Sequence, residues 1–281
     1  MKNKTILFFL KVCCFMVFAG RAYQHLFWDS PFRSVLWDQN LLEPFVNSVF
    51  NMSWKDYVTD LSIDHKIQTL IRLNGWFYLF CAIVSLTIKS TSNKIFKSIL
   101  FLGGCNLVVL ALLLTKNKFY HFAMFFEHAI QFGVPFLLYY FLKNESVRWL
   151  LPKLKLIISI SFICHGLYAI GLIYPIPENF VTMTLNILPI NEINAKQFLF
   201  TMGILDFIFA FLIFIPKFSK VSLIYAFMWG FITAIARVLS GLKYGVSLHI
   251  LHQYFYQTIY RIPHGIIPLL TYLIIKKNRM K

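Results

Sequence analysis

Ten polar or ionisable side chains stand inside or at the ends of long apolar runs in this 281-residue sequence. An ionised group in hydrocarbon costs roughly 2.5–3.5 kcal/mol on insertion scales, so such groups are expected to be paired or to line a cavity. We therefore take these ten residues as candidate ligand-binding residues: Arg21, Arg72, Glu127, His128, Gln131, His165, Asp206, Arg237, Arg261 and His264.

Two interpretations of these residues stay open. In the first they are structural, with Asp206 paired to Arg237 and Glu127 paired to Arg72 or to its neighbour His128. Interhelical hydrogen bonds in membranes average only about 0.6 kcal/mol, which is small compared with so many insertion costs. In the second they line a cavity. Four arginines against two carboxylates leave a surplus of about two positive charges, which favours an anionic or electron-rich ligand.

The composition identifies the bilayer as the solvent. The chain is 58% hydrophobic and 14% charged, whereas soluble domains are about 45–50% apolar and about 25% charged. The net charge of +16 does not indicate a nucleic-acid partner, because the basic residues gather between the apolar runs, where they act as topology signals. We expect the lipid bilayer, and no nucleic acid, among the partners.

Eight apolar runs are long enough to cross a bilayer, since a span needs roughly 20 mostly apolar residues. The first run resembles a cleaved signal peptide, but residues 19–22 are a poor cleavage site, so we expect it to be retained. The sequence thus predicts an all-α integral membrane protein with spans at 5–25, 66–88, 95–115, 119–142, 154–175, 197–215, 221–241 and 255–275.

Basic residues fix the expected orientation through the positive-inside rule. Of the 27 Lys and Arg residues, 15 fall on one side of an eight-span chain, including Lys2, Arg279 and Lys281 at its ends, while eight of the 11 acidic residues fall in the opposite loops. The sequence therefore predicts a multi-pass protein of the cell's inner membrane with both termini in the cytoplasm. The buried polar residues then lie at or beyond the midplane on the outer side.

The chain also repeats itself weakly. Residues 20–42 match residues 166–188 at an offset of 146, and Gly75 matches Gly203 at an offset of 128. The motif His128-x-x-Gln131-x-x-x-Pro135 matches Arg261-x-x-His264-x-x-x-Pro268 at an offset of 133. Each half has an even number of spans, which makes the repeat parallel. We expect two four-helix repeats, residues 1–143 with a long outer loop at 29–65, and residues 144–281.

The second half resembles the DoxX-like family of membrane proteins. The residues that carry the resemblance are His165-Gly166, the hinge Pro175–Pro177, Phe180-x-x-Met183, and Gly203-x-x-Asp206, where the family often has Glu in the last position. It covers residues 155–275 well and 10–142 loosely. It implies a four-helix bundle that is sometimes linked to quinone or sulfur redox chemistry. A fainter likeness is to the horizontally transferred transmembrane domain family, whose soluble catalytic extension we do not find in this sequence.

Three prolines fall within the fourth and eighth predicted spans. Pro135, Pro263 and Pro268 interrupt the backbone hydrogen-bond ladder, so they predict kinks just inward of the polar cluster. Such kinks would widen the bundle toward the outside, or would serve only packing curvature.

Motifs for soluble catalysis are missing from the sequence: it has no nucleotide-binding loop, dinucleotide fingerprint or nucleophile elbow. The spacing His249-x-x-His252 is more typical of interfacial histidines than of a metal site, and the five cysteines lie in apolar runs where thiols are inert. We therefore favour a binding or accessory subunit over an enzyme, with an outward-facing polar cavity for a small anionic, quinone or lipid-like ligand and a partner membrane subunit. The alternatives are a quinone-linked oxidoreductase and a small-molecule transporter.

Overall fold

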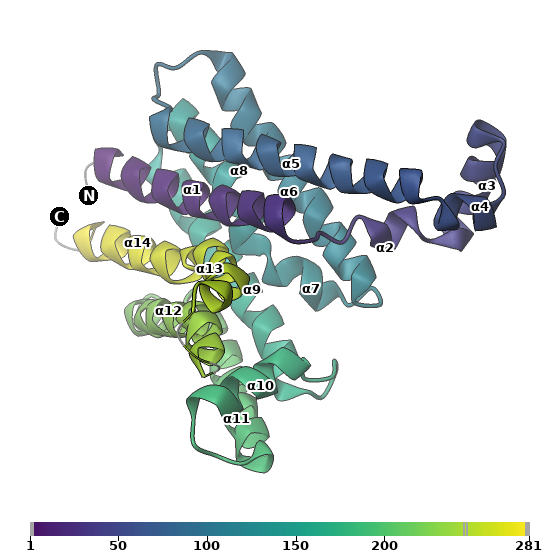
Figure 1. Cartoon of the computed structure of the whole chain (residues 1–281). Coiled ribbons are helices and arrows are strands. Elements are labelled where there is room, and N and C mark those ends of the chain that lie inside the picture. Colours follow the sequence, from purple (N-terminus) through teal and green to yellow (C-terminus); the bar gives the residue numbers. More distant parts are fainter. Residues whose placement is uncertain (1–2, 244, 246, 279–281) are drawn as a thin grey trace.

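The computed structural model describes residues 3–243, 245 and 247–278, and across these residues the chain is helical and contains no strand (Figure 1). Three residues of the predicted basic side, Lys2, Arg279 and Lys281, lie outside the described residues. The helices are α1 (Asn3–Phe27), α2 (Arg33–Leu36), α3 (Gln39–Phe50), α4 (Trp54–Thr59), α5 (Leu61–Thr87), α6 (Lys94–Asn117), α7 (Phe122–Glu127), α8 (Ala129–Asn144), α9 (Val147–Ile170), α10 (Glu178–Ile187), α11 (Glu192–Leu212), α12 (Ser219–Leu242), α13 (Leu248–Arg261) and α14 (Pro263–Asn278).

Seven helical segments of the described chain are long and apolar enough to cross a membrane. They are α1, α5, α6, α9, α11, α12 and the joined pair α13–α14, and they correspond to seven of the eight predicted spans. The predicted span at 119–142 is instead divided into α7 and α8. The longer of these, α8, has only 16 residues, fewer than the roughly 20 that a span requires.

The break between α7 and α8 falls at His128 and not at a proline. The backbone N–H of Ile130, near the start of α8, donates to the hydroxyl of Ser161 on α9 at 3.2 Å, so a neighbouring helix satisfies the freed group. In the eighth predicted span the break falls at Ile262, and Pro263 opens α14 because it has no N–H to leave unsatisfied. Pro135 and Pro268 lie inside α8 and α14 without ending them.

Short polar residues begin most of the long helices, as their capping chemistry requires. Ser146 accepts a hydrogen bond from the backbone of Trp149 at the start of α9, and Asn191 accepts one from Asn194 at the start of α11. Asp60 does the same for α5. These caps set the residue at which each helix begins.

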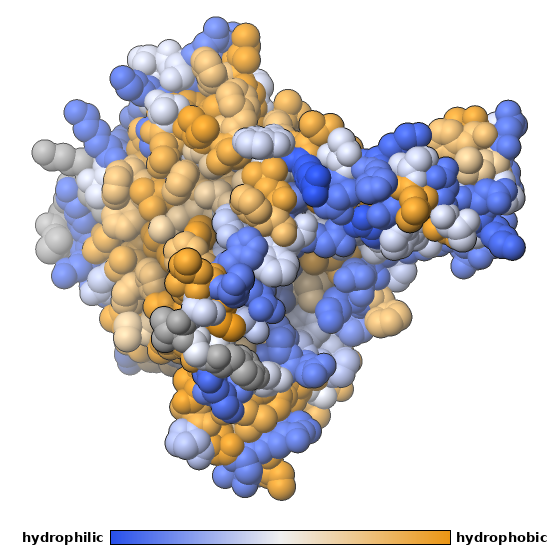
Figure 2. All heavy atoms as spheres, viewed as in Figure 1, coloured by the Kyte–Doolittle hydropathy of each residue, from blue (hydrophilic) through white to orange (hydrophobic). Residues whose placement is uncertain are grey.

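The predicted outer loop at 29–65 is folded. It contains α2, α3, α4 and the first turn of α5, and it projects from the bundle as an arm (Figure 1). Its surface is more hydrophilic than that of the bundle, where apolar side chains dominate (Figure 2). Arg33 joins the ends of the arm through ion pairs to Asp29 at 2.9 Å and Asp64 at 2.8 Å, and Lys116 of α6 pairs with Asp38. The arm is therefore anchored to two helices of the bundle.

Helix contacts follow the same scheme in both halves of the described chain. In the first half α1 packs along α5 and α6 packs on α8; in the second α9 packs along α11 and α12 packs on α14. The halves meet where α1 contacts α13 and α14, and where α9 contacts α7 and α8. Gly75 and Gly203 allow the close approach within each half: a Cβ on Gly75 would meet Leu26 of α1 at 2.9 Å, and one on Gly203 would meet Ile170 of α9 at 2.8 Å.

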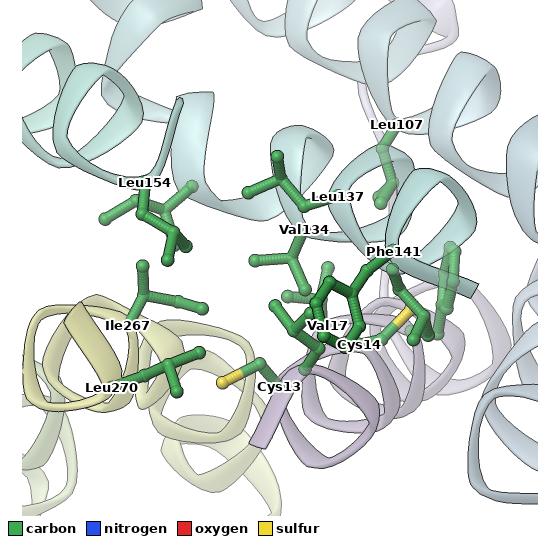
Figure 3. Packing of buried hydrophobic residues seen from close by; sticks show 14 of the residues in the cluster. Cys13, Cys14, Val17, Leu107, Val134, Leu137, Phe141, Leu154, Ile267 and Leu270 are labelled. Carbon is green, nitrogen blue, oxygen red and sulfur yellow. The ribbon is translucent and has the colours of Figure 1, made fainter. Parts of the chain in front are cut away.

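An apolar core fills the centre of the bundle on the side where both ends of the described chain lie. It is built from buried side chains of α1, α8, α9 and α14, including Cys13, Val134, Phe141, Leu154 and Leu270 (Figure 3). All five cysteines are free, and four of them are buried, which is consistent with inert thiols. The polar residues therefore gather at the opposite end of the same helices.

Candidate functional site

The structure buries or half-buries nine of the ten candidate residues. Arg72 is the exception. It lies exposed on α5, and no ion pair joins it to any residue in the described chain. The predicted pairing of Glu127 with Arg72 was therefore wrong, because position along a span does not reveal which face of a helix turns inward.

Arg21 is buried among neutral partners. Its side chain is 2% exposed, and its Nε and Nη2 donate to Oε1 of Gln131 at 3.2 and 2.7 Å. Its Nη1 donates to Oε1 of Gln24 at 2.7 Å, and the guanidinium carbon lies 4.0 Å from the ring centroid of Tyr260. These contacts satisfy the geometry of the guanidinium and give it a cation–π contact. No carboxylate within the described residues neutralises its charge at ion-pair distance.

Glu127 pairs across the two halves with Arg261, with 2.8 Å between Oε1 and Nη1. Its neighbour His128 is not its partner, since the Nδ1 of His128 lies 2.8 Å from the carbonyl oxygen of Met124. A carbonyl only accepts, so this nitrogen carries the proton. His264 makes the equivalent bond from Nδ1 to the carbonyl oxygen of Arg261 at 3.0 Å, which leaves its Nε2 free to face the interior.

Asp206 is fully buried and has two side-chain partners. Its Oδ2 lies 2.7 Å from Nδ1 of His165 on α9, and the hydroxyl of Tyr225 on α12 donates to its Oδ1 at 2.7 Å. The predicted pair Asp206–Arg237 was wrong: the guanidinium of Arg237 donates to the carbonyl of Thr233 on its own helix. Sequence reasoning missed Tyr225. Its only signal is a polar group within an apolar run on the next helix.

A cavity of about 570 Å³, here called the central cavity, opens between the two halves. It is lined by side chains of α1, α7, α13 and the hinge before α10, among them Arg21, Gln24, Lys118, Glu127, Glu178 and Arg261. Three cationic and two anionic side chains face it, so the local surplus is one positive charge and not the two expected. The sequence did not single out Gln24, Lys118, Glu178 or Tyr260.

A smaller hollow of about 20 Å³, the connecting pocket, lies between the central cavity and His165. Arg261, His264 and Trp229 line it, and each has a buried nitrogen, Nε, Nε2 and Nε1 respectively, without a hydrogen-bond partner among the described residues. Buried polar groups are normally satisfied. This volume holds about one water molecule or one ligand atom group, which is what three converging nitrogens require.

The two histidines of the His249-x-x-His252 spacing do not form a site together with acidic residues. The ring of His252 packs against Trp28 and bonds through Nδ1 with the hydroxyl of Tyr23, which is an interfacial role between α13 and α1. Within residues 3–243, 245 and 247–278, no three His, Cys, Asp or Glu side chains gather closely enough to hold a metal ion.

Comparison of the chain with models of protein families, with curated proteins and with solved structures finds no match.

Proposed function

We propose that the chain is a DoxX-like protein with eight membrane crossings in two parallel four-helix repeats and both termini in the cytoplasm. The equivalent helix packing in the two halves supports the repeat. The helix breaks at His128 and Ile262 also support the repeat, because the two positions nearly match when the halves are aligned at the offset of 133. On this view α7 and α8 together, residues 122–144, make the fourth of the eight crossings.

We further propose that the protein is a binding or accessory subunit that holds a small anionic ligand in the central cavity. The observation that carries this function is Arg21: a guanidinium that is 2% exposed, lines the cavity and is bonded only to neutral amides. A buried charge without a counter-ion is costly, and a bound anion removes that cost. In the connecting pocket, Nε of Arg261 and Nε1 of Trp229 add unpartnered donors beside it.

Binding is favoured over transport because apolar packing closes the other end of the bundle. There the buried side chains of Val17, Phe141 and Leu270 pack together in the apolar core (Figure 3). A second candidate is quinone-linked redox chemistry, favoured by the Asp206–His165 pair: when Nδ1 of the neutral imidazole donates to the carboxylate, Nε2 is an acceptor for the hydroxyl of a hydroquinone.

Native mass spectrometry of the full chain in mild detergent tests the proposal. We expect a bound small molecule on the wild type and on the matched control Arg72→Gln, whose arginine is exposed, and its loss from Arg21→Gln. A ligand retained by Arg21→Gln, or none on the wild type, contradicts binding at this cavity. An isoprenoid quinone in the lipid extract would instead favour the redox candidate.

A further inference from the structure

A second hollow lies beneath α10, apart from the central cavity. This α10 pocket has a volume of about 140 Å³ and is formed by α9, α10, α11 and α12. The apolar face of α10 roofs it with Phe180, Met183 and Ile187, while Trp229 and Ile232 of α12 form a wall. Phe180 stands between the two hollows, since it lines both of them.

Arg237 is the one cationic side chain that lines the pocket among the described residues, and it is 5% exposed. Its hydrogen bond runs to the carbonyl of Thr233 on its own helix, and no carboxylate of the described chain lies within ion-pair distance of it. The hydroxyls of Thr184 and Thr233, which also line the pocket, already donate to carbonyls of their own helices. His165 also lines the pocket, but its Nδ1 bonds Asp206. A lone guanidinium in a pocket whose other walls are mostly apolar lacks the counter-ion that its burial calls for.

We propose that the α10 pocket binds a lipophilic carboxylate, whose carboxylate pairs with Arg237 and whose hydrocarbon body fills the pocket. One arginine matches one negative charge, and the flat guanidinium fork suits two carboxylate oxygens. A phosphate dianion would call for further cations, which this pocket does not present.

The dimensions limit the ligand. A closed apolar cavity of about 150 Å³ holds a benzene molecule, so the α10 pocket accepts a body of about six carbons. Its rim includes Ile187 and Ile232, which are 39% and 52% exposed, and Ile232 belongs to the apolar outer face of a membrane-crossing helix. A longer chain can therefore pass between these two residues into lipid, from which the ligand enters.

Fluorescence quenching by 6-bromohexanoate tests this inference on the full chain in nanodiscs of zwitterionic lipid. Bromine quenches nearby indoles, and Trp229 lies in the pocket wall. We expect saturable quenching in the wild type and in Arg72→Gln, and its loss in Trp229→Phe. Arg237→Gln should weaken binding about ten- to hundredfold, because a charge-assisted pair is removed, and Arg237→Lys should restore part of it.

A comparison of two ligands on the wild type tests the proposal without relying on a variant that must fold. The alcohol 6-bromohexanol has the same body without the charge, so it should bind the wild type at least about tenfold more weakly. Equal quenching by the alcohol and the carboxylate, or unchanged affinity in a folded Arg237→Gln, overturns the proposal. Neither result bears on the central cavity, since Arg21 does not line the α10 pocket.

Discussion

The contact between Asp206 and His165 gives a quantitative test of the polar cluster. The carboxylate is fully buried and has one nitrogen partner and one hydroxyl partner, each at 2.7 Å. His165→Phe removes the nitrogen and leaves a buried carboxylate short of a partner, which costs about 3–5 kcal/mol. Asp206→Asn removes the charge but keeps an acceptor for Tyr225, and should cost about 1–2 kcal/mol.

When both residues are replaced, the imidazole and the charged carboxylate are lost together, so no buried charge is left without its partner. The double variant should therefore lose less stability than the sum of the singles. Coupling energies between residues in contact reach about 0.5–3 kcal/mol, and those of hydrogen bonds inside membranes reach about 1.7 kcal/mol. We expect about 1–2 kcal/mol for this pair.

Equilibrium unfolding of the four proteins by SDS titration in mixed micelles, followed by tryptophan fluorescence, measures this energy. The cycle between Asp206 and Arg237 is the matched control, because the structure gives these two residues no shared bond. It should be additive within about 0.5 kcal/mol. Additivity for Asp206 with His165, or strong coupling of Asp206 with Arg237, would refute the arrangement described here.

Three further outcomes are expected. Ser161→Ala removes the hydroxyl that accepts the N–H of Ile130 near the start of α8, so it should lower the free energy of unfolding by about 1–3 kcal/mol. The matched control Ser222→Ala should cost less, because this hydroxyl donates to the carbonyl of Phe218 at the start of its own helix. Gly203→Ala places a Cβ 3.0 Å from a carbonyl oxygen of α9 and should cost about 1–3 kcal/mol in the same unfolding assay. The hydrogen bond from Lys116 holds the pKa of Asp38 below its usual value. The ionised carboxylate therefore stabilises the fold above about pH 4, and this stabilisation is lost as the pH falls through the lowered pKa. Asp38→Asn should therefore melt below the wild type at pH 7, and the two should melt alike once the pH has fallen below the lowered pKa of Asp38.

The long apolar helices could be predicted from the sequence because length and hydropathy are local properties. Seven predicted spans have helices long enough to cross a membrane. The predicted span at 119–142 fails as a single helix because of the break at His128, where a hydroxyl of α9 accepts a freed N–H, and no local pattern encodes that contact. Pro263, by contrast, marks its break directly, since a residue without an N–H can open a helix at no cost.

The inward position of the candidate residues could be predicted from the sequence, but their contacts could not. Inserting a charge in a membrane is costly wherever it occurs, so the sequence alone selects the candidates, and nine of the ten are turned inward. Partners depend on helix rotation and on which helices meet between the halves. Glu127 bonds a residue 134 positions away, and Asp206 bonds one 41 positions away on a helix that precedes it. Nearest-charge reasoning chose Arg72 and Arg237 and failed for both.

The charges that remain after pairing are the ones that point to function. Each carboxylate within the predicted spans has a nitrogen partner, Glu127 with Arg261 and Asp206 with His165. The two other buried arginines, Arg21 and Arg237, have none, and each lines a different hollow. If these arginines served only to join helices, apolar or amide side chains would do so without the cost of a buried charge. A buried guanidinium without a counter-ion is costly, and only a bound anion removes this cost. Such a site is therefore selective for anions. The two hollows then differ in what surrounds the charge: polar, charged and apolar side chains share the walls around Arg21, whereas the walls around Arg237 are mostly apolar. On the functions proposed above, the first suits a small hydrophilic anion and the second an amphiphile.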